Sequence, residues 1–272
     1  MLRIIKPIDD RTLLEELADL WRGRGILAVL IRRDISVRYR QAALGVLWAL
    51  LQPIVTTAIF TLVFVVFIRL PSTDVPYPVF AFAGLVIWQY FNRAVAEGTL
   101  SLVANAGLIT KVYFPRMVIP LVAPCSAALD CLLGVAALVA IALLFQAQLQ
   151  WTAALVPLVV LFVGLFGYAV GLCLAPLQAI YRDIGIVLPF ALQIAMYLSP
   201  IAYPAGIVPE SVRWLYRLNP IAVMVDTMRW ALVGSEPPSP AGVVFTLVLI
   251  GLLLWGGLNI FRRLEGTLVD RI

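Results

Sequence analysis

The sequence predicts an all-α integral membrane protein with six transmembrane helices, an N-terminal amphipathic interface helix and short re-entrant outer helices before the last span. The first observation is composition: 62% of the 272 residues are hydrophobic, 13% are charged, and the mean hydropathy is +1.00. Soluble domains carry about 25% charged residues, so the surplus apolar surface must face lipid. The second observation is the pattern of apolar residues along the chain. They form continuous runs of about 20 residues, the length of a membrane-crossing helix.

These runs divide the chain into two parts. Residues 1–45 are rich in charge and are predicted to form a cytoplasmic amphipathic interface segment, and residues 46–272 form the transmembrane domain. Between the last two spans, residues 204–240 are rich in proline and contain helical stretches that we expect to enter the membrane without crossing it. The six predicted spans are residues 46–68, 78–96, 117–145, 152–180, 184–203 and 241–261.

The distribution of basic residues predicts the orientation. Sixteen of the 20 Lys and Arg residues lie on one side of the six spans, in the N-terminal segment, the second and fourth connections and the C-terminal end. Cytoplasmic segments carry such an excess of Lys and Arg. We therefore expect a multi-pass protein of the plasma membrane, the inner membrane in a bacterium, with both termini in the cytoplasm.

The residue inventory excludes most catalytic chemistries. Histidine is absent, which removes imidazole bases, Ser-His-Asp triads and histidine-bound metals. The three cysteines lie in apolar stretches without metal-type spacing, and neither lysine, Lys6 or Lys111, lies in a glycine-rich phosphate loop. The sequence therefore predicts a non-catalytic chain with no metal site, no cofactor and no nucleic-acid partner.

A basic helix precedes the first span. Residues 26–39 mix aliphatic side chains with arginines, which continue to Arg40. Such a helix lies in the membrane interface, where its arginines reach lipid phosphates or a protein partner. Two interpretations stay open: a simple anchor on the positive side of the membrane, or a collar against a cytoplasmic subunit.

The connection after the second span is too polar to cross the membrane and more apolar than a solvated loop needs. An exposed apolar cluster with a basic rim is typical of a protein docking surface. The alternative is a loop that folds back onto its own bundle. The apolar residues are Leu108, Ile109, Val112, Tyr113 and Phe114, and the basic rim is Lys111 and Arg116.

Asp130 lies near the middle of the third predicted span, where an isolated carboxylate costs about 2.5 kcal/mol or more. It must therefore face the bundle interior, a wet cavity or a partner. A structural hydrogen bond or a place along a pathway is favoured over a proton relay, because no second intramembrane acid or histidine completes a chain. Arg93 and Glu97 are one helical turn apart and are expected to pair.

Aromatic side chains recur on the first two spans. Packing and interface belts account for most such residues in membrane helices. The alternative is that these rings line a pathway and stack on sugar rings. With Asp130, the candidate pathway residues are Phe60, Phe64, Phe67, Trp88, Tyr90 and Phe91.

Four sequence blocks occur in order along the chain. They are residues 30–41 with 44–48 and 52–53, residues 108–116, residues 181–184, and Asn219-Pro220 followed by Arg229 and Gly234. In this order the blocks resemble the polysaccharide-export ABC transporter permeases, the O-antigen, capsule and teichoic-acid exporters of the type-2 ABC membrane-domain superfamily. The likeness covers nearly the whole chain. Ala42-Ala43 and Asp226 depart from the pattern and leave the cargo open.

The resemblance implies a homodimer of six-span subunits docked on two cytoplasmic P-loop ATPase subunits. The complex would move a lipid-linked glycan outward from the cytoplasm, along a path between the protomers and in contact with membrane lipids. The implied interface-helix residues are Arg32, Arg33, Asp34, Arg38, Tyr39 and Arg40. The implied ATPase-coupling residues are Leu108, Ile109, Thr110, Lys111, Val112, Tyr113, Phe114, Pro115 and Arg116. The implied outer gate residues are Trp214, Tyr216, Asn219, Pro220 and Arg229.

Three alternatives remain at the level of sequence. A drug or lipid exporter permease of the same superfamily would share these motifs. A proton-coupled carrier would depend on Asp130. A membrane-embedded transferase or phosphatase would need histidine or paired carboxylates near one lipid face, and the sequence offers neither.

Overall fold

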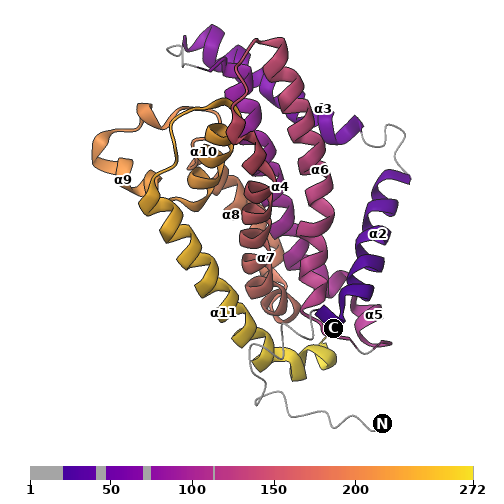
Figure 1. Cartoon of the computed structure of the whole chain (residues 1–272). Helices are drawn as coiled ribbons and strands as arrows, with labels where there is room; N and C mark the ends of the chain where they lie inside the picture. Colours follow the sequence, from indigo (N-terminus) through magenta and orange to yellow (C-terminus); the bar gives the residue numbers. More distant parts are fainter. Residues whose placement is uncertain (1–20, 41–46, 70–74, 113, 272) are drawn as a thin grey trace.

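The computed structural model describes residues 21–40, 47–69, 75–112 and 114–271, which form helices and turns (Figure 1). Five helical segments in these ranges are long and apolar enough to cross a membrane, so the chain is a multi-pass membrane protein. Helix α3 (Leu47–Thr61) continues into the π-helical turn Leu62–Phe67, and the short 3₁₀ turn Trp151–Leu155 leads into α7. The other long helices are α4 (Tyr77–Ala104), α6 (Val118–Leu144), α7 (Val156–Ile180) and α11 (Pro240–Arg271).

The predicted fifth span, residues 184–203, is shorter than expected. Helix α8 (Asp183–Tyr197) has 15 residues, a length of about 22 Å against about 30 Å of hydrocarbon. It stops just before Ser199-Pro200, because a residue that precedes proline is disfavoured in the helical conformation. The sixth crossing therefore stays a prediction.

The predicted second span, residues 78–96, is longer than expected. Helix α4 continues past Glu97 to Ala104, and the one-turn helix α5 (Ala106–Ile109) follows it. The polar residue Glu97 suggested an end to the span, but it is ion-paired with Arg93 and with Arg38. A neutralised carboxylate does not force the helix to end.

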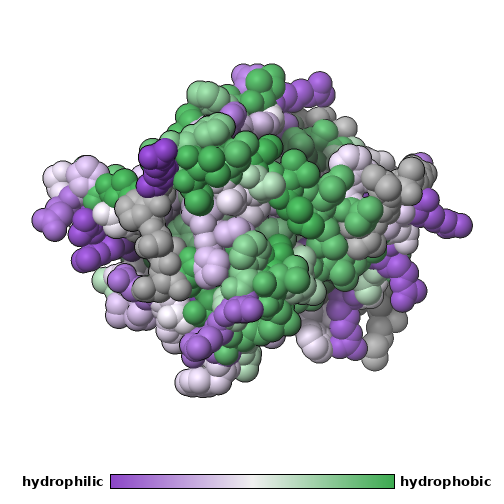
Figure 2. Space-filling view, turned by 90° about the horizontal axis from the view of Figure 1, so that it is seen from above, coloured by the Kyte–Doolittle hydropathy of each residue, from purple (hydrophilic) through white to green (hydrophobic). Residues whose placement is uncertain are grey.

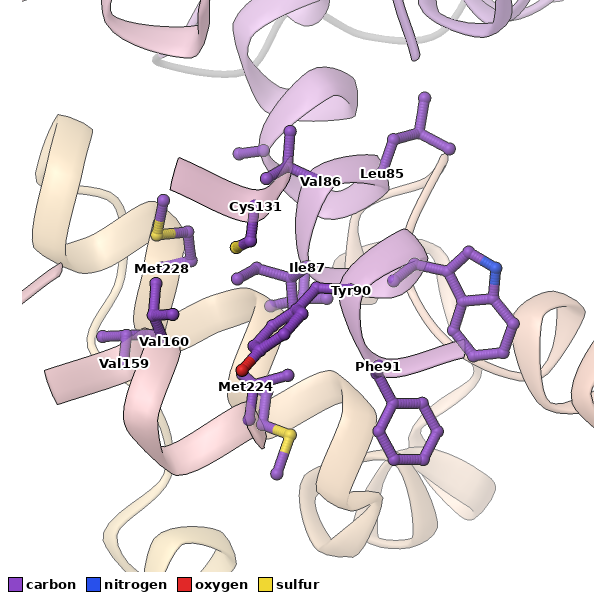
Figure 3. Close-up of a cluster of buried hydrophobic side chains, with 14 of the residues drawn as sticks. Leu85, Val86, Ile87, Tyr90, Phe91, Cys131, Val159, Val160, Met224 and Met228 are labelled. Carbon is purple, nitrogen blue, oxygen red and sulfur yellow. The ribbon is translucent and has the colours of Figure 1, made fainter. Parts of the chain in front are cut away.

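Helix α4 lies at the centre of the bundle, packed between α6 and α7. Its side chains form one core with those of α6, α7 and α10 (Pro220–Val233); in Figure 3, Ile87 and Tyr90 lie among Val160 and Met228. The backbones of α4 and α7 approach closely at Gly167 of α7, where an added Cβ would lie 2.6 Å from the Cβ of Ala94 on α4. Small residues allow such close approach between membrane helices.

The segment between α8 and α11 contains two helices, as predicted: α9 (Glu210–Leu218) and α10. Helix α10 ends at Gly234, whose left-handed conformation (φ 69°) suits glycine. Both helices lie away from α5, which shares its end of the molecule with the start of α2 (Arg24–Arg40) and the end of α11 (Figure 1). Seen from the end opposite α5, apolar residues cover much of the surface (Figure 2).

Helix α2 runs lengthwise against α6 (Figure 1). The ion pairs described below hold the end of α2 beside the middle of α6. Its predicted location in the membrane interface stays a prediction. Residues 1–20, which include the earlier part of the predicted interface segment, lie outside the described residues.

Candidate functional site

Helix α2 has two distinct faces. Its packed face carries aliphatic residues such as Leu30 together with two polar residues, Asp34 and Arg38, four positions apart. Arg32, Arg33 and Arg40 are exposed. Of the predicted interface residues, Asp34, Arg38 and Tyr39 therefore face the bundle side, Arg32 and Arg40 face outward, and the guanidinium of Arg33 reaches the end of α4.

An ionic cluster joins α2, α4 and α6. Arg38 donates to Asp130 at 3.0 Å, to both Glu97 oxygens at 3.2 Å and to Asp34 at 3.2 Å. Arg93 donates to Glu97 at 2.9 Å, as the sequence predicts, and also ion-pairs with Asp130. Asp130 is thus not isolated, and three helices are tied together by charge-assisted bonds.

A cavity of about 300 Å³ adjoins the ionic cluster, between α3, α4 and α6. Arg93, Glu97 and Asp130 line it, with three side-chain amides, and its apolar walls include Val86 and Ala127. The amides are those of Gln52, Gln89 and Asn92.

The amide residues were not identified from the sequence, although a signal exists. Gln89, Asn92, Arg93 and Glu97 follow one another at intervals of three, one and four, so they form a polar stripe along one face of α4. A polar stripe inside an otherwise apolar span indicates a face that avoids lipid.

The predicted aromatic pathway residues fall into two groups. Trp88 is 4% and Phe91 5% exposed, and Phe91 stacks on Phe166 of α7 at 5.1 Å, so both are core residues of this subunit. Tyr90 is also buried, and its hydroxyl donates to the carbonyl of Pro124 at 3.2 Å. On the first span Phe60 packs edge-on against Phe64, and Phe67 is exposed.

The predicted coupling segment is divided between buried and exposed residues. Ile109 and Phe114 are buried in a second core with Tyr168 and Phe261, contrary to the expected exposed apolar cluster. They fold back onto the bundle because they bury their apolar surface against side chains of α4, α6, α7 and α11. Leu108, Pro115 and Arg116 are half-buried, and Tyr113 lies outside the described residues. The exposed residues are Thr110, Lys111 and Val112, the last 46% exposed.

The end of α4, just before the predicted coupling segment, also contacts α2. Arg33 donates from its guanidinium to the side-chain oxygen of Asn105 at 2.5 Å. Helix α2 is therefore held at two levels, by Asn105 next to α5 and by the ionic cluster farther along. A displacement of the turn at Lys111 would be transmitted to α4 and α6, which it connects, and to α2.

The predicted gate residue Arg229 is buried, with 2% of its surface exposed. Its guanidinium donates to the carbonyls of Phe80, Pro200 and Ile201 at 3.2, 2.9 and 2.8 Å, and it lies 3.4 Å from the centre of the Phe80 ring. Burial lowers the pKa of Arg229 to about 10, so the residue stays charged at neutral pH. Arg229 thus fastens α10 to α4 and to the turn after α8.

The other predicted gate residues have separate places: Tyr216 lines a cavity of about 590 Å³, Asn219 and Pro220 begin α10, and Trp214 is exposed. Tyr216 lines this cavity, between α9, α10 and the start of α11, and its hydroxyl is 2.7 Å from that of Tyr203. Asn219 caps α10 by accepting from the backbone N–H of Ile221 at 2.9 Å, and Pro220 is the first residue of α10, where proline is favoured. Trp214 is 61% exposed.

The sequence is similar to those of known transport proteins. The chain is 28% identical over 243 residues to an O-antigen export system permease protein RfbA of Klebsiella pneumoniae, covering 88% of this chain and 92% of the relative. It is 27% identical to an RfbA of Myxococcus xanthus, over 93% and 98% of the two chains, and 25% identical to the polysialic acid transport protein KpsM of Escherichia coli, over 88% and 93%. Residues 26–233, most of the chain, match the ABC-2 type transporter family, and the chain therefore belongs to that family.

Proposed function

We propose that this protein is the membrane-spanning permease of an ATP-driven exporter of polysaccharide. Relatives that match at least 88% of this chain carry the names of O-antigen export and polysialic acid transport permeases. The motifs that resemble polysaccharide-export permeases extend from α2 to Gly234 and agree in order with that assignment. The cargo that we propose is a glycan linked to a lipid, moved outward from the cytoplasm.

The energy comes from a separate cytoplasmic ATPase. The observation that carries this proposal is the exposed turn Thr110-Lys111-Val112, which is fixed at its flanks by the buried side chains of Ile109 and Phe114. An exposed apolar residue beside a lysine, on a firmly anchored turn, suits a protein contact better than a flexible loop does.

The ATPase acts on the permease by contact. Closure of the ATPase subunits pushes the turn at Val112, and the load passes into α4 and α6, which carry the ionic cluster and its cavity. In this proposal two protomers form the path between them, α8 completes a sixth crossing, and α9 and α10 enter the membrane at the outer side. The excess of basic residues places both termini in the cytoplasm.

The test changes one residue of the turn. Val112→Glu removes apolar contact area between the permease and the ATPase. It also places a carboxylate there that would be desolvated without a partner. The matched control is Val212→Glu on α9. Val212 has a similar exposure, 43%, and α9 lies away from α5 and the turn that contains Val112.

We expect Val112→Glu to reduce the amount of ATPase that co-purifies with the permease at least tenfold, while membrane insertion is unchanged. The control should retain the ATPase. Equal co-purification with both variants would contradict the coupling surface.

A further inference from the structure

Helix α2 is attached to the bundle by few apolar contacts. Leu30 is the one buried side chain among the residues of α2, all of which the structure describes, and Val37 is 59% exposed. Burial of apolar surface is what normally fastens a helix to its neighbours, and α2 has little of it. The ion pairs that Arg38 makes with α4 and α6 therefore carry a large part of the attachment.

The ionic cluster divides into two parts, each with its own partners. Arg38 ion-pairs on its own helix with Asp34, four positions earlier, at 3.2 Å. Arg93 ion-pairs with Glu97 on its own helix and with Asp130 of α6. If α2 moved away, Arg38 would keep Asp34, and the two carboxylates of the bundle would keep Arg93. An ion pair is costly to break when it leaves a charge without a partner, and here the separation leaves none.

The two parts also differ in their access to water. The side chains of Asp34 and Glu97 are 35% and 42% exposed, whereas those of Arg93 and Asp130 are 19% and 17% exposed. Water competes for the charges of an exposed ion pair and weakens it, and it competes less where the pair is shielded. The line of easiest separation therefore runs between α2 and the pair Arg93–Asp130.

The position of α2 connects the proposed ATPase contact with the first span. The start of α2 lies at the end of the molecule that holds α5, and Arg33 donates to Asn105, directly before α5 (Figure 1). Helix α3 follows α2 in the chain, and among the described residues of α3 only Pro53 and Thr57 are buried. A movement that starts at the turn of Val112 can thus pass through α2 to a span that its own subunit holds loosely.

We propose that α2 is a reversible latch that couples the ATPase to the path between the protomers. The latch opens when Arg38 leaves Glu97 and Asp130, and Asp34 then remains as its partner. Closure of the ATPase shifts the start of α2, α2 separates from α6, and α3 moves with it and opens the path. Arg38 is a positioning residue, since it contacts neither cargo nor nucleotide in this account. The inference rests on the proposed function as an ATP-driven permease.

The first experiment measures whether α2 separates from α6 during transport. It uses the complex of permease and ATPase, in which Leu30→Cys places a thiol on the packed face of α2 and the control Val29→Cys places one at a position that is 67% exposed. We expect ATP with vanadate to speed the modification of Leu30→Cys by a charged methanethiosulfonate reagent at least tenfold. The rate for Val29→Cys should change less than twofold. The native cysteines are first replaced by alanine with export retained: Cys125, Cys131 and Cys173.

Substitutions at the two ends of the latch should shift this rate in opposite directions. Arg38→Gln removes the contacts that close the latch, so Leu30→Cys should react fast even without nucleotide. Asp34→Asn removes the partner that Arg38 keeps when the latch is open, so Leu30→Cys should react slowly even with ATP and vanadate. A purely structural role would make both variants loosen α2.

The second experiment measures coupling. Arg38→Gln should lower polysaccharide export at least tenfold, while the complex retains at least half of its ATP hydrolysis and the ATPase still co-purifies. Arg38→Lys keeps the charge and should restore part of the export. The matched control Arg263→Gln removes an exposed arginine of α11 and should leave export and ATP hydrolysis unchanged.

The outcomes separate the two proposals. If the unaltered complex exports polysaccharide and Leu30→Cys reacts equally slowly with and without nucleotide, α2 is not a latch, although the permease function stands. Equal loss of export and ATP hydrolysis in Arg38→Gln, or fast modification in both Arg38→Gln and Asp34→Asn, would also refute the latch. Absence of polysaccharide export by the unaltered complex would instead refute the proposed function.

Discussion

Arginines join helices in two regions of the molecule, and their burial and partners differ: Arg229 is buried, whereas Arg38 and Arg93 are half-buried. Arg229 donates to the backbone carbonyls of Phe80, Pro200 and Ile201 and lies against the Phe80 ring. Its carboxylate neighbour Asp226 is farther away, at 3.5 Å. Arg38 and Arg93 have carboxylates as their partners, on three different helices, and a cavity adjoins them.

The difference separates a fixed joint from a region that can change. Backbone carbonyls cannot exchange protons or move independently of their helices, so Arg229 holds one geometry. Side-chain carboxylates on separate helices have alternative partners, and the ionic cluster retains a buried donor and a buried acceptor that are unused. We therefore assign Arg229 to the stability of the fold and the ionic cluster to transport.

The largest effect is expected at Arg229. Arg229→Met leaves three carbonyls without a donor in a buried place, which costs about 3–5 kcal/mol. Arg229→Lys should rescue little, because an ammonium group cannot reproduce the planar fork. The measurement is thermal unfolding of the purified protein in detergent.

Asp226→Asn is the matched control for Arg229. The carboxylate of Asp226 is 3.5 Å from Nη1 of Arg229 and 37% exposed, so solvent screens this ion pair and it contributes little. We expect its loss to change stability by less than about 1 kcal/mol. A larger loss than that of Arg229→Met would show that the ion pair, and not the carbonyls, holds the joint.

In the ionic cluster we expect a smaller effect on stability, seen as an interaction energy between two substitutions. Arg38→Gln and Asp130→Asn remove the two ends of one ion pair in a network, so their effects on stability should not add. The double variant should differ from the sum of the single variants by about 0.5–3 kcal/mol. Both single variants should also reduce export, since they loosen α2 from α6.

Additive effects on stability would mean that Arg38 and Asp130 do not interact in the folded protein. Retained export in both single variants would remove the ionic cluster from the mechanism. Either result would contradict the distinction between Arg229, assigned to stability, and the ionic cluster, assigned to transport.

Hydropathy was sufficient to predict the long helices. Lipid requires about 20 apolar residues in each crossing, so the approximate positions of α3, α4, α6, α7 and α11 follow from the continuous apolar runs along the chain. The local pair Arg93–Glu97 could also be predicted, because its spacing places both side chains on one turn. Local pattern predicted the ends of helices less well. Helix α4 continues past Glu97 to Ala104, and α8 ends at Tyr197, before Pro200.

Contacts between distant segments could not be predicted. Arg38 and Asp130 are 92 positions apart, and no periodicity joins them. The partners of Arg229 are backbone carbonyls, which every residue carries. The sequence therefore gives no sign of which carbonyls Arg229 binds. Trp88 and Phe91 lie on a helix that is apolar on nearly every side, so the pattern could not tell a buried ring from one facing a path.

The central claim is that this chain moves cargo only when a separate ATPase acts on it. The most direct measurement is translocation of a fluorescent lipid-linked oligosaccharide in vesicles that contain the permease with or without its ATPase. The account predicts transport that requires both the ATPase and ATP hydrolysis. Equal transport by the permease alone, or transport driven by a proton gradient without ATP, would contradict it.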